Sequence, residues 1–132
     1  MDTKNKTATN INREIKFRYY FTNHAPVVLN LSEISNGALH NLLQGNAGFV
    51  NHICEFTGLK DKNGKEIYEG DELVEGGDSL IVRFGVPEST QFVDNKSPRF
   101  YCELDDGSLW DFEEDDEPIV IGNIYEGNAN EH

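Results

Sequence analysis

Apolar and polar residues alternate along much of the chain, and this alternation predicts strands more often than helices. In residues 14–21 the apolar side chains fall on one face and the basic side chains on the other, which is the period-2 pattern of a half-buried strand. The apolar set is Ile15, Phe17 and Tyr19, and the basic set is Lys16 and Arg18. Similar runs, separated by Gly, Asn and Pro, predict strands at residues 27–31, 49–57, 79–85, 99–104, 109–112 and 118–125.

A single short helix interrupts this series of strands. Apolar residues lie at near-helical spacing between Ser32 and Gly45, and Gly45 itself is a helix stop signal. Because glycine weakens a helix interior, Gly37 is expected to shorten the helix so that it begins near Asn36. Short strands with turn signals about every ten residues then predict a mostly β fold: a small antiparallel barrel or sandwich with one short helix.

The length of 132 residues fits one domain. Residues 1–12 are polar and lack apolar periodicity, so we expect them to form a disordered N-terminal arm. The domain itself is predicted at residues 13–126, and residues 127–132 are expected to be a disordered tail. No apolar run approaches the length of a membrane span, and the first residues do not resemble a signal peptide, so we expect a cytoplasmic protein that does not contact membranes.

The most informative local pattern is an Asn-Gly pair, Asn63-Gly64, which signals a hairpin. A two-residue loop would pair like charges, whereas a three-residue loop of residues 62–64 pairs Lys60 with Glu66 and Asp61 with Lys65. Opposite charges across a hairpin stabilise it, so the charge pattern predicts the three-residue loop with Gly64 in the left-handed conformation. The same register sets Leu59 opposite Ile67, and it sets Tyr68 over Gly58.

Three segments together resemble the YopX family of phage and prophage proteins. They are the long run Thr57-Gly58-Leu59-Lys60-Asp61-Lys62-Asn63-Gly64-Lys65-Glu66-Ile67-Tyr68-Glu69-Gly70-Asp71, the preceding Arg13-Glu14-Ile15-Lys16-Phe17-Arg18, and the later Ile121-Gly122-Asn123-Ile124-Tyr125-Glu126. The resemblance departs at two flanks: Tyr19-Tyr20 stands where the family often has Ala-Trp, and Gly127-Asn128-Ala129 replaces Asn-Pro-Glu. It implies a small SH3-like β-barrel encoded by a phage or mobile element, and it implies no activity or catalytic residues.

The charge of the chain is strongly acidic and unevenly distributed. Eleven basic and twenty-four acidic residues give a net charge of −13, yet residues 1–18 hold five bases and only two acids. Nucleic acids require clustered Lys and Arg, so an acidic body disfavours DNA, RNA and anionic membranes. Nucleic-acid binding by a small barrel through the basic segment from Lys4 to Arg18 remains as an alternative function.

Nine carboxylates and no base lie between Glu103 and Glu117. Within this run, Asp105-Asp106-Gly107-Ser108 is a hairpin-turn signal, since glycine follows aspartate. Residues 111–117 hold six acids in seven positions, so they repel one another and can simply be a solvated loop. They can also be a cation site, a docking surface for a basic partner, or a mimic of nucleic-acid charge, and aromatic residues beside the acids suit a protein interface. We therefore predict a non-enzymatic module that binds a host or phage protein with a basic surface, with homo-oligomers through exposed strand edges as a further expectation. The candidate binding residues are Trp110, Asp111, Phe112, Glu113, Glu114, Asp115, Asp116 and Glu117.

Two other residue sets suggest chemistry only weakly. Gly77-Asp78-Ser79-Leu80 has the letters of an esterase nucleophile block, but no Asp-x-x-His follows and a glycine-rich turn explains it better. His52 and Cys54, with Cys102 and either His24 or His40, could hold zinc in principle. Core packing of the cysteines is the favoured interpretation, so we predict no catalytic residues, no metal and no cofactor.

Overall fold

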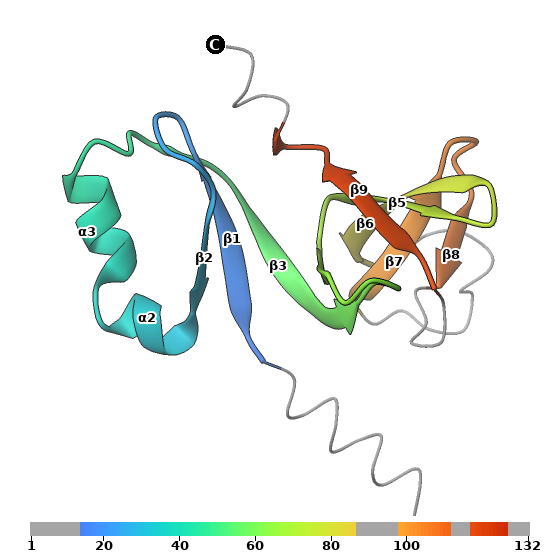
Figure 1. Cartoon of the computed structure of the whole chain (residues 1–132), viewed down its shortest axis with the longest axis horizontal. Coiled ribbons are helices and arrows are strands. Elements are labelled where there is room, and N and C mark those ends of the chain that lie inside the picture. Colours follow the sequence, from blue (N-terminus) through green and yellow to red (C-terminus); the bar gives the residue numbers. More distant parts are fainter. Residues whose placement is uncertain (1–13, 87–97, 112–116, 127–132) are drawn as a thin grey trace, which may run out of the picture.

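The computed structural model describes residues 14–86, 98–111 and 117–126 of the chain (Figure 1). The predicted arm at residues 1–12 and the predicted tail at residues 127–132 lie outside these described residues, as do residues 112–116 of the candidate acidic site. Among the described residues, no helix is long and apolar enough to cross a membrane.

The described strands form two antiparallel sheets. The first sheet has the order β2-β1-β3-β4 and the second β8-β7-β6-β5-β9. Their bounds are β1 Lys16–Phe21, β2 Val27–Asn30, β3 Val50–Lys60, β4 Glu66–Tyr68, β5 Asp71–Glu75, β6 Asp78–Gly85, β7 Arg99–Leu104, β8 Leu109–Asp111 and β9 Ile119–Asn123. The mostly β, antiparallel prediction is confirmed. The sheets do not close into a barrel, so the finer SH3-like prediction is not confirmed.

Two short helices, not one, follow β2. They are α2 Leu31–Ser35 and α3 Ala38–Gln44. The helix predicted to begin near Asn36 and to stop at Gly45 is present as α3. The prediction that it is the single helix was wrong, because it missed the capping box that begins α2: Asn30 accepts from the Glu33 amide while the Glu33 carboxylate accepts from the Asn30 amide, both at 2.8 Å. Gly37 separates the helices with a φ of +92°, a value that favours glycine.

Strand β1 is buried on both faces, which its alternating sequence did not predict. Tyr19 and Phe21 pack with Leu29 and with residues of the two helices on one face. Figure 1 shows both helices on the β2 side of the first sheet. On the other face, Tyr20 packs with Cys54, Phe56 and Tyr68. The face of β1 that was expected to be polar therefore packs against other side chains of the core, and Arg18 on that face is partly buried.

The hairpin between β3 and β4 has the predicted three-residue loop. Lys60 pairs with Glu66, and the Asp61 amide donates to the Lys65 carbonyl at 2.7 Å, while Gly64 has a φ of +85°. The register then shifts, so that Tyr68 lies opposite Phe56 and the prediction of Tyr68 over Gly58 was wrong. Within the irregular stretch between Phe56 and Lys60, the Thr57 hydroxyl donates to the Ile67 carbonyl at 2.8 Å and Gly58 has a φ of +91°, as in a β-bulge.

The second sheet folds around a core of five buried residues: Ile67, Leu73, Leu80, Val82 and Cys102. Strands β5 and β6 are joined at Gly76-Gly77, where both glycines have positive φ, and this is the glycine-rich turn predicted there. The predicted turn around Asp106-Gly107 joins β7 to β8, with the Leu104 amide donating to the Ser108 carbonyl at 3.0 Å. Strand β9 pairs with β5 and forms one edge of this sheet (Figure 1).

Asp61 links the hairpin to β9. Its Oδ1 accepts from the amides of Asn63 and Lys65, both at 2.8 Å, and its Oδ2 accepts from the Val120 amide at 3.0 Å. Burial acts to raise the pKa of Asp61, but these three amides, with Lys65, lower it below its ordinary 3.8. The charged carboxylate therefore stabilises the folded chain, since folding lowers its pKa.

Asp61→Asn is expected to lower the free energy of unfolding by about 1–3 kcal/mol at pH 7, because the amide nitrogen cannot accept from Val120. The stabilisation is present above the ordinary carboxyl pKa and is lost as the pH falls through the lowered folded-state pKa. Urea unfolding of both proteins at a series of pH values checks this. The difference between them should be largest near neutrality and shrink below about pH 4, and a constant difference down to low pH would contradict the role of the charge.

Candidate functional site

Two of the predicted binding residues lie on β8, an edge strand of the second sheet. Trp110 pairs with Cys102 across the sheet, and 44% of Trp110 is exposed because β8 has no further strand beside it in the described residues. Asp111 and Glu117 are also exposed. The remaining candidates, Phe112, Glu113, Glu114, Asp115 and Asp116, lie outside the described residues.

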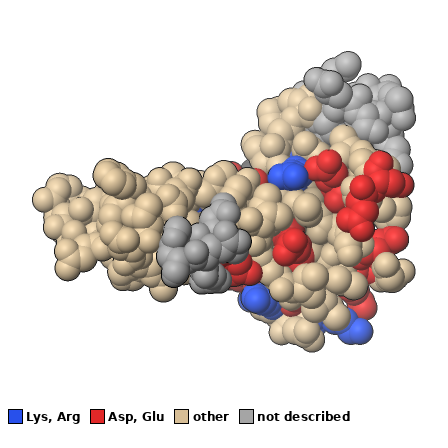
Figure 2. Space-filling view, turned by 90° about the horizontal axis from the view of Figure 1, so that it is seen from above, with Lys and Arg blue, Asp and Glu red and all other residues tan. Residues whose placement is uncertain are grey.

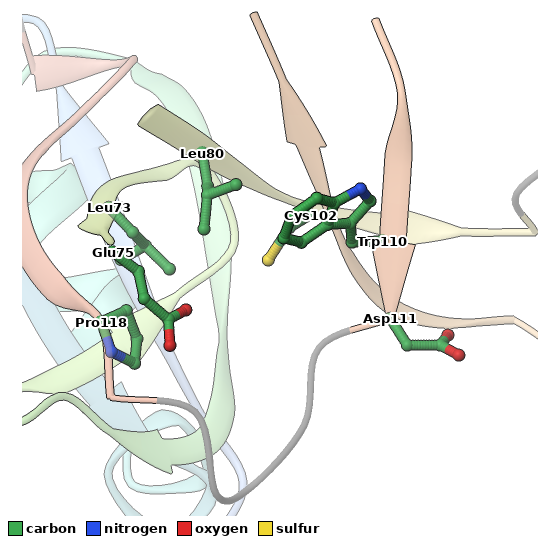
Figure 3. Close-up of a pocket in the computed structure, with 7 residues that line it drawn as sticks. All are labelled: Leu73, Glu75, Leu80, Cys102, Trp110, Asp111 and Pro118. Carbon is green, nitrogen blue, oxygen red and sulfur yellow. The ribbon is translucent and has the colours of Figure 1, made fainter. Parts of the chain in front are cut away.

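A shallow pocket opens beneath Trp110. Leu73, Leu80 and Cys102 form its apolar floor, and Glu75 and Pro118 lie along its side (Figure 3). Figure 3 shows the Asp111 carboxylate directed away from this floor. The pocket volume is about 10 Å³, which is room for roughly one water molecule. Ligand pockets are commonly about 300–1,000 Å³, so this surface offers an aromatic anchor with a small depression, and not a small-molecule site.

Some acids of the predicted cluster are used locally. Asp111 lies 3.3 Å from the Arg99 Nε, and Glu103 accepts from the Arg83 Nε at 3.0 Å. Asp106 accepts from the Ser108 amide at 2.9 Å and so fixes the β7–β8 turn. Hydrogen bonds from Ser108 lower the pKa of Asp106. Some carboxylates of the cluster therefore make structural contacts, and Arg83 and Arg99 offset part of its negative charge.

Charge is nonetheless divided sharply between the ends of the molecule. From Asp71 onward, the described residues hold ten acids against Arg83 and Arg99. Residues 19–50, which include both helices, hold Glu33 as their single acid and no Lys or Arg. Figure 2 shows Asp and Glu gathered over the end with the second sheet, while the visible face of the helical end is uncharged. The acidic surface is thus a property of one end and not of the whole chain.

A buried ionic network joins the two sheets. The Asp71 Oδ1 accepts from Asn123 Nδ2 at 2.9 Å and lies 3.5 Å from the Arg18 guanidinium, while its Oδ2 accepts from the Tyr68 amide at 2.8 Å. Burial raises the pKa of Asp71, although Asn123, the Tyr68 amide and Arg18 all favour its charged form. A cavity of about 140 Å³ lies beside this network, lined in part by Arg18, Asn123 and Glu126. Its volume is small for a ligand site, and the network serves packing.

His52 and Cys54 have a different neighbour from those the sequence suggested. Their donor atoms lie with a carboxylate oxygen of Glu69, all within 4.8 Å of one another. Cys102 belongs to the core of the second sheet, whereas Cys54 packs with Tyr20 and Tyr68. Burial and the nearby Glu69 raise the pKa of the Cys54 thiol to about 12. Sequence reasoning did not consider Glu69, because only the β3–β4 hairpin brings it beside β3.

Ser79 of the esterase-like segment lies on β6, two residues after the Gly76-Gly77 turn. Its side chain is exposed, and it pairs with Val74 of β5. This strand leads into β7 and not into a helix within the described residues. The local structure is therefore the turn and strand that the sequence favoured.

The fold and this site define a small, mostly β protein whose two antiparallel sheets carry an acidic edge with an exposed tryptophan. The family model described as YopX protein matches residues 2–129, nearly the whole chain. The chain therefore belongs to the YopX family. No curated protein matches it.

Proposed function

We propose that this protein is a non-enzymatic acidic module that binds a host or phage protein through the β8 edge. The observation that carries the proposal is the exposure of Trp110 beside carboxylates on an edge strand. A half-exposed aromatic in an acidic setting gives a partner both an apolar anchor and electrostatic steering. The family resemblance implies a phage or mobile element in a bacterium, so the expected compartment is the cytoplasm.

The steering charge is supplied by the acidic end as a whole. Exposed Asp105, Asp111 and Glu117 lie around the β8 edge, and the segment from Phe112 to Asp116 adds four more acids in sequence. A partner would approach under long-range attraction and dock its apolar residues against Trp110. Because exposed charges act mainly on the association rate, binding should weaken as salt rises.

Affinity recovery from the bacterial host tests this proposal. Tagged wild-type protein, washed with nuclease, is expected to retain a basic protein identified by mass spectrometry. A variant with Asp111 and the acids of residues 113–117 changed to their amides is expected to lose it, as is Trp110→Ala. We expect at least a tenfold drop in recovery for Trp110→Ala, since aromatic hot-spot residues commonly contribute about 2 kcal/mol or more.

Phe84→Ala is the matched control, because Phe84 is a half-exposed aromatic elsewhere on the same sheet. Its recovery of the partner should equal that of the wild type. Equal recovery by all four proteins, or no specific partner for any of them, would contradict the proposal. The acidic run would then be interpreted as a solvated loop.

Nucleic-acid binding through the basic N-terminal segment is the second candidate. Lys16 lies 2.5 Å from Glu66 and Arg18 lies 3.5 Å from Asp71, so both described bases of that segment are already paired with carboxylates. These pairs favour the protein-binding proposal. Retardation of DNA or RNA at low salt that disappears when residues 1–12 are removed would favour the alternative. A charge mimic would instead compete with nucleic acid for the recovered partner.

Self-association is a further part of the proposal. The open sheets leave β2, β4, β8 and β9 as edge strands among the described residues, and unpaired edges can join a second copy. Sedimentation of the purified chain distinguishes a monomer from an oligomer.

A further inference from the structure

We propose that His52, Cys54 and Glu69 form a binding site for a divalent transition-metal ion, with Zn²⁺ as the ion that suits them best. Their ligand atoms all lie within 4.8 Å of one another. Zinc takes imidazole nitrogen, thiolate sulfur and carboxylate oxygen, and three protein ligands leave its fourth tetrahedral position for water. Harder ions such as Mg²⁺ and Ca²⁺ prefer all-oxygen sites and do not suit this set.

The backbone brings these three side chains together. His52 and Cys54 are two residues apart on β3, so their side chains fall on the same face of the strand. Glu69 follows β4 directly, and its amide donates to the Glu55 carbonyl at 2.9 Å. One strand therefore supplies two ligands, and the partner strand's turn supplies the third.

The spacing is close to that of a tetrahedral site. Nitrogen and oxygen ligands bound at their usual distances from zinc lie roughly 3.4 Å apart, and nitrogen and sulfur roughly 3.6 Å apart. His52 Nε2 and Glu69 Oε1 are 3.7 Å apart, which nearly matches. The sulfur lies at most 4.8 Å from either of the other two ligand atoms, so it needs to approach by at most about 1.2 Å, which side-chain rotation provides.

The surroundings hold the ligands in place. The Tyr125 ring stacks on the His52 ring, with centroids 3.4 Å apart and planes 18° apart. The Asn123 side chain donates to the Glu69 carbonyl at 3.3 Å and to Asp71 Oδ1 at 2.9 Å, so it holds the backbone of one ligand residue in place. Cys54 is fully buried, whereas the side chains of His52 and Glu69 are 34% and 18% exposed, so the ion would enter from their side.

Charge balance also favours a divalent ion. On binding, a metal–sulfur bond forms and the Cys54 thiol releases its proton to solvent. Thiolate and carboxylate together then carry two negative charges, which a divalent ion neutralises. Because His52 and Cys54 belong to the first sheet and Tyr125 follows β9 of the second, the bound ion would stabilise the contact between them.

Zinc and cobalt binding by the full chain tests the site. After treatment with a chelator, the protein is expected to bind one equivalent of Zn²⁺ in competition with a chromophoric zinc indicator. Co²⁺ should give the thiolate-to-metal charge-transfer band and the strong visible bands of a tetrahedral site. Glu69→Gln and His52→Phe, which keep size and ring stacking, should each weaken Zn²⁺ binding tenfold or more.

Cys102→Ser is the matched control, since Cys102 is a buried cysteine of the other core, and it should retain one equivalent. Cys54→Ser removes the sulfur and should also weaken Zn²⁺ binding, but it changes a fully buried position. If this variant does not fold, the Zn²⁺ affinities of Glu69→Gln and His52→Phe test the site. Failure of the wild type to bind one equivalent would overturn the site. So would Co²⁺ binding without a thiolate band, or equal affinity in Glu69→Gln and the wild type.

Discussion

Replacing Asp71 with alanine is expected to lower the free energy of unfolding by about 3–5 kcal/mol, because it leaves the partly buried Arg18 without its carboxylate. Only 1% of Asp71 is exposed. The same change removes the acceptor for the Tyr68 amide and for the Asn123 side chain. Since small domains have a total stability of about 5–15 kcal/mol, the variant should lose a large fraction of its stability.

Urea unfolding followed by circular dichroism measures this loss. Glu72→Ala is the matched control, because Glu72 is the next acid on β5 but is only half-buried, and it should change the stability by less than about 1 kcal/mol. Arg18→Met in the Asp71→Ala background removes the unpaired charge and should restore part of the loss. If Asp71→Ala unfolds at the same urea concentration as Glu72→Ala, the network does not hold the two sheets together.

Gly70→Ala is expected to cost about 3 kcal/mol or more, because it combines a strained backbone with a steric clash. Gly70 has a φ of +87°, where side chains are disfavoured. An added Cβ would lie 2.8 and 3.0 Å from two carbons of the Tyr125 ring. That ring stacks on His52, and the Gly70 carbonyl accepts from the Ile124 amide at 2.9 Å, so neither neighbour can move freely.

Gly64→Ala separates the two contributions. Gly64 has nearly the same φ, +85°, but nothing lies within 4 Å of an added Cβ. It should therefore cost only the backbone term of about 1–2 kcal/mol. Thermal unfolding of both variants gives the difference, which we attribute to packing against Tyr125. Equal losses would mean that the last described turn does not pack tightly on Gly70.

Local patterns in the sequence predicted local structure well. The charges of residues 60–66 were enough to choose the loop of the β3–β4 hairpin, and glycine positions were enough to find the turns between β5 and β6 and between β7 and β8. These features depend on residues close together in the chain. The capping box at Asn30 and Glu33 was also local, and its signal, an asparagine followed three residues later by glutamate, was available but overlooked.

Contacts between distant segments could not be predicted in the same way. The alternation in β1 indicated one polar face, yet Asp71 and Asn123 come from elsewhere in the chain to meet Arg18 on that face. Likewise, Glu69 joins His52 and Cys54 through the pairing of β4 with β3, whose register shifts between Phe56 and Lys60. Near the candidate acidic site, the sequence predicted a strand at residues 109–112, but neither its place at the edge of the sheet nor the arginine partners of Glu103 and Asp111 on β6 and β7.

Site-specific photo-crosslinking in the bacterial host tests the proposed binding surface most directly. A photoreactive residue at Asp105, which is exposed in the turn beside β8, is compared with one at Asn46, which is exposed after α3 at the uncharged end. Our account predicts a crosslink from position 105 to a protein with a basic surface, no such crosslink from position 46, and its loss with Trp110→Ala. Absence of any crosslink from position 105, or the same crosslink from both positions, would contradict it.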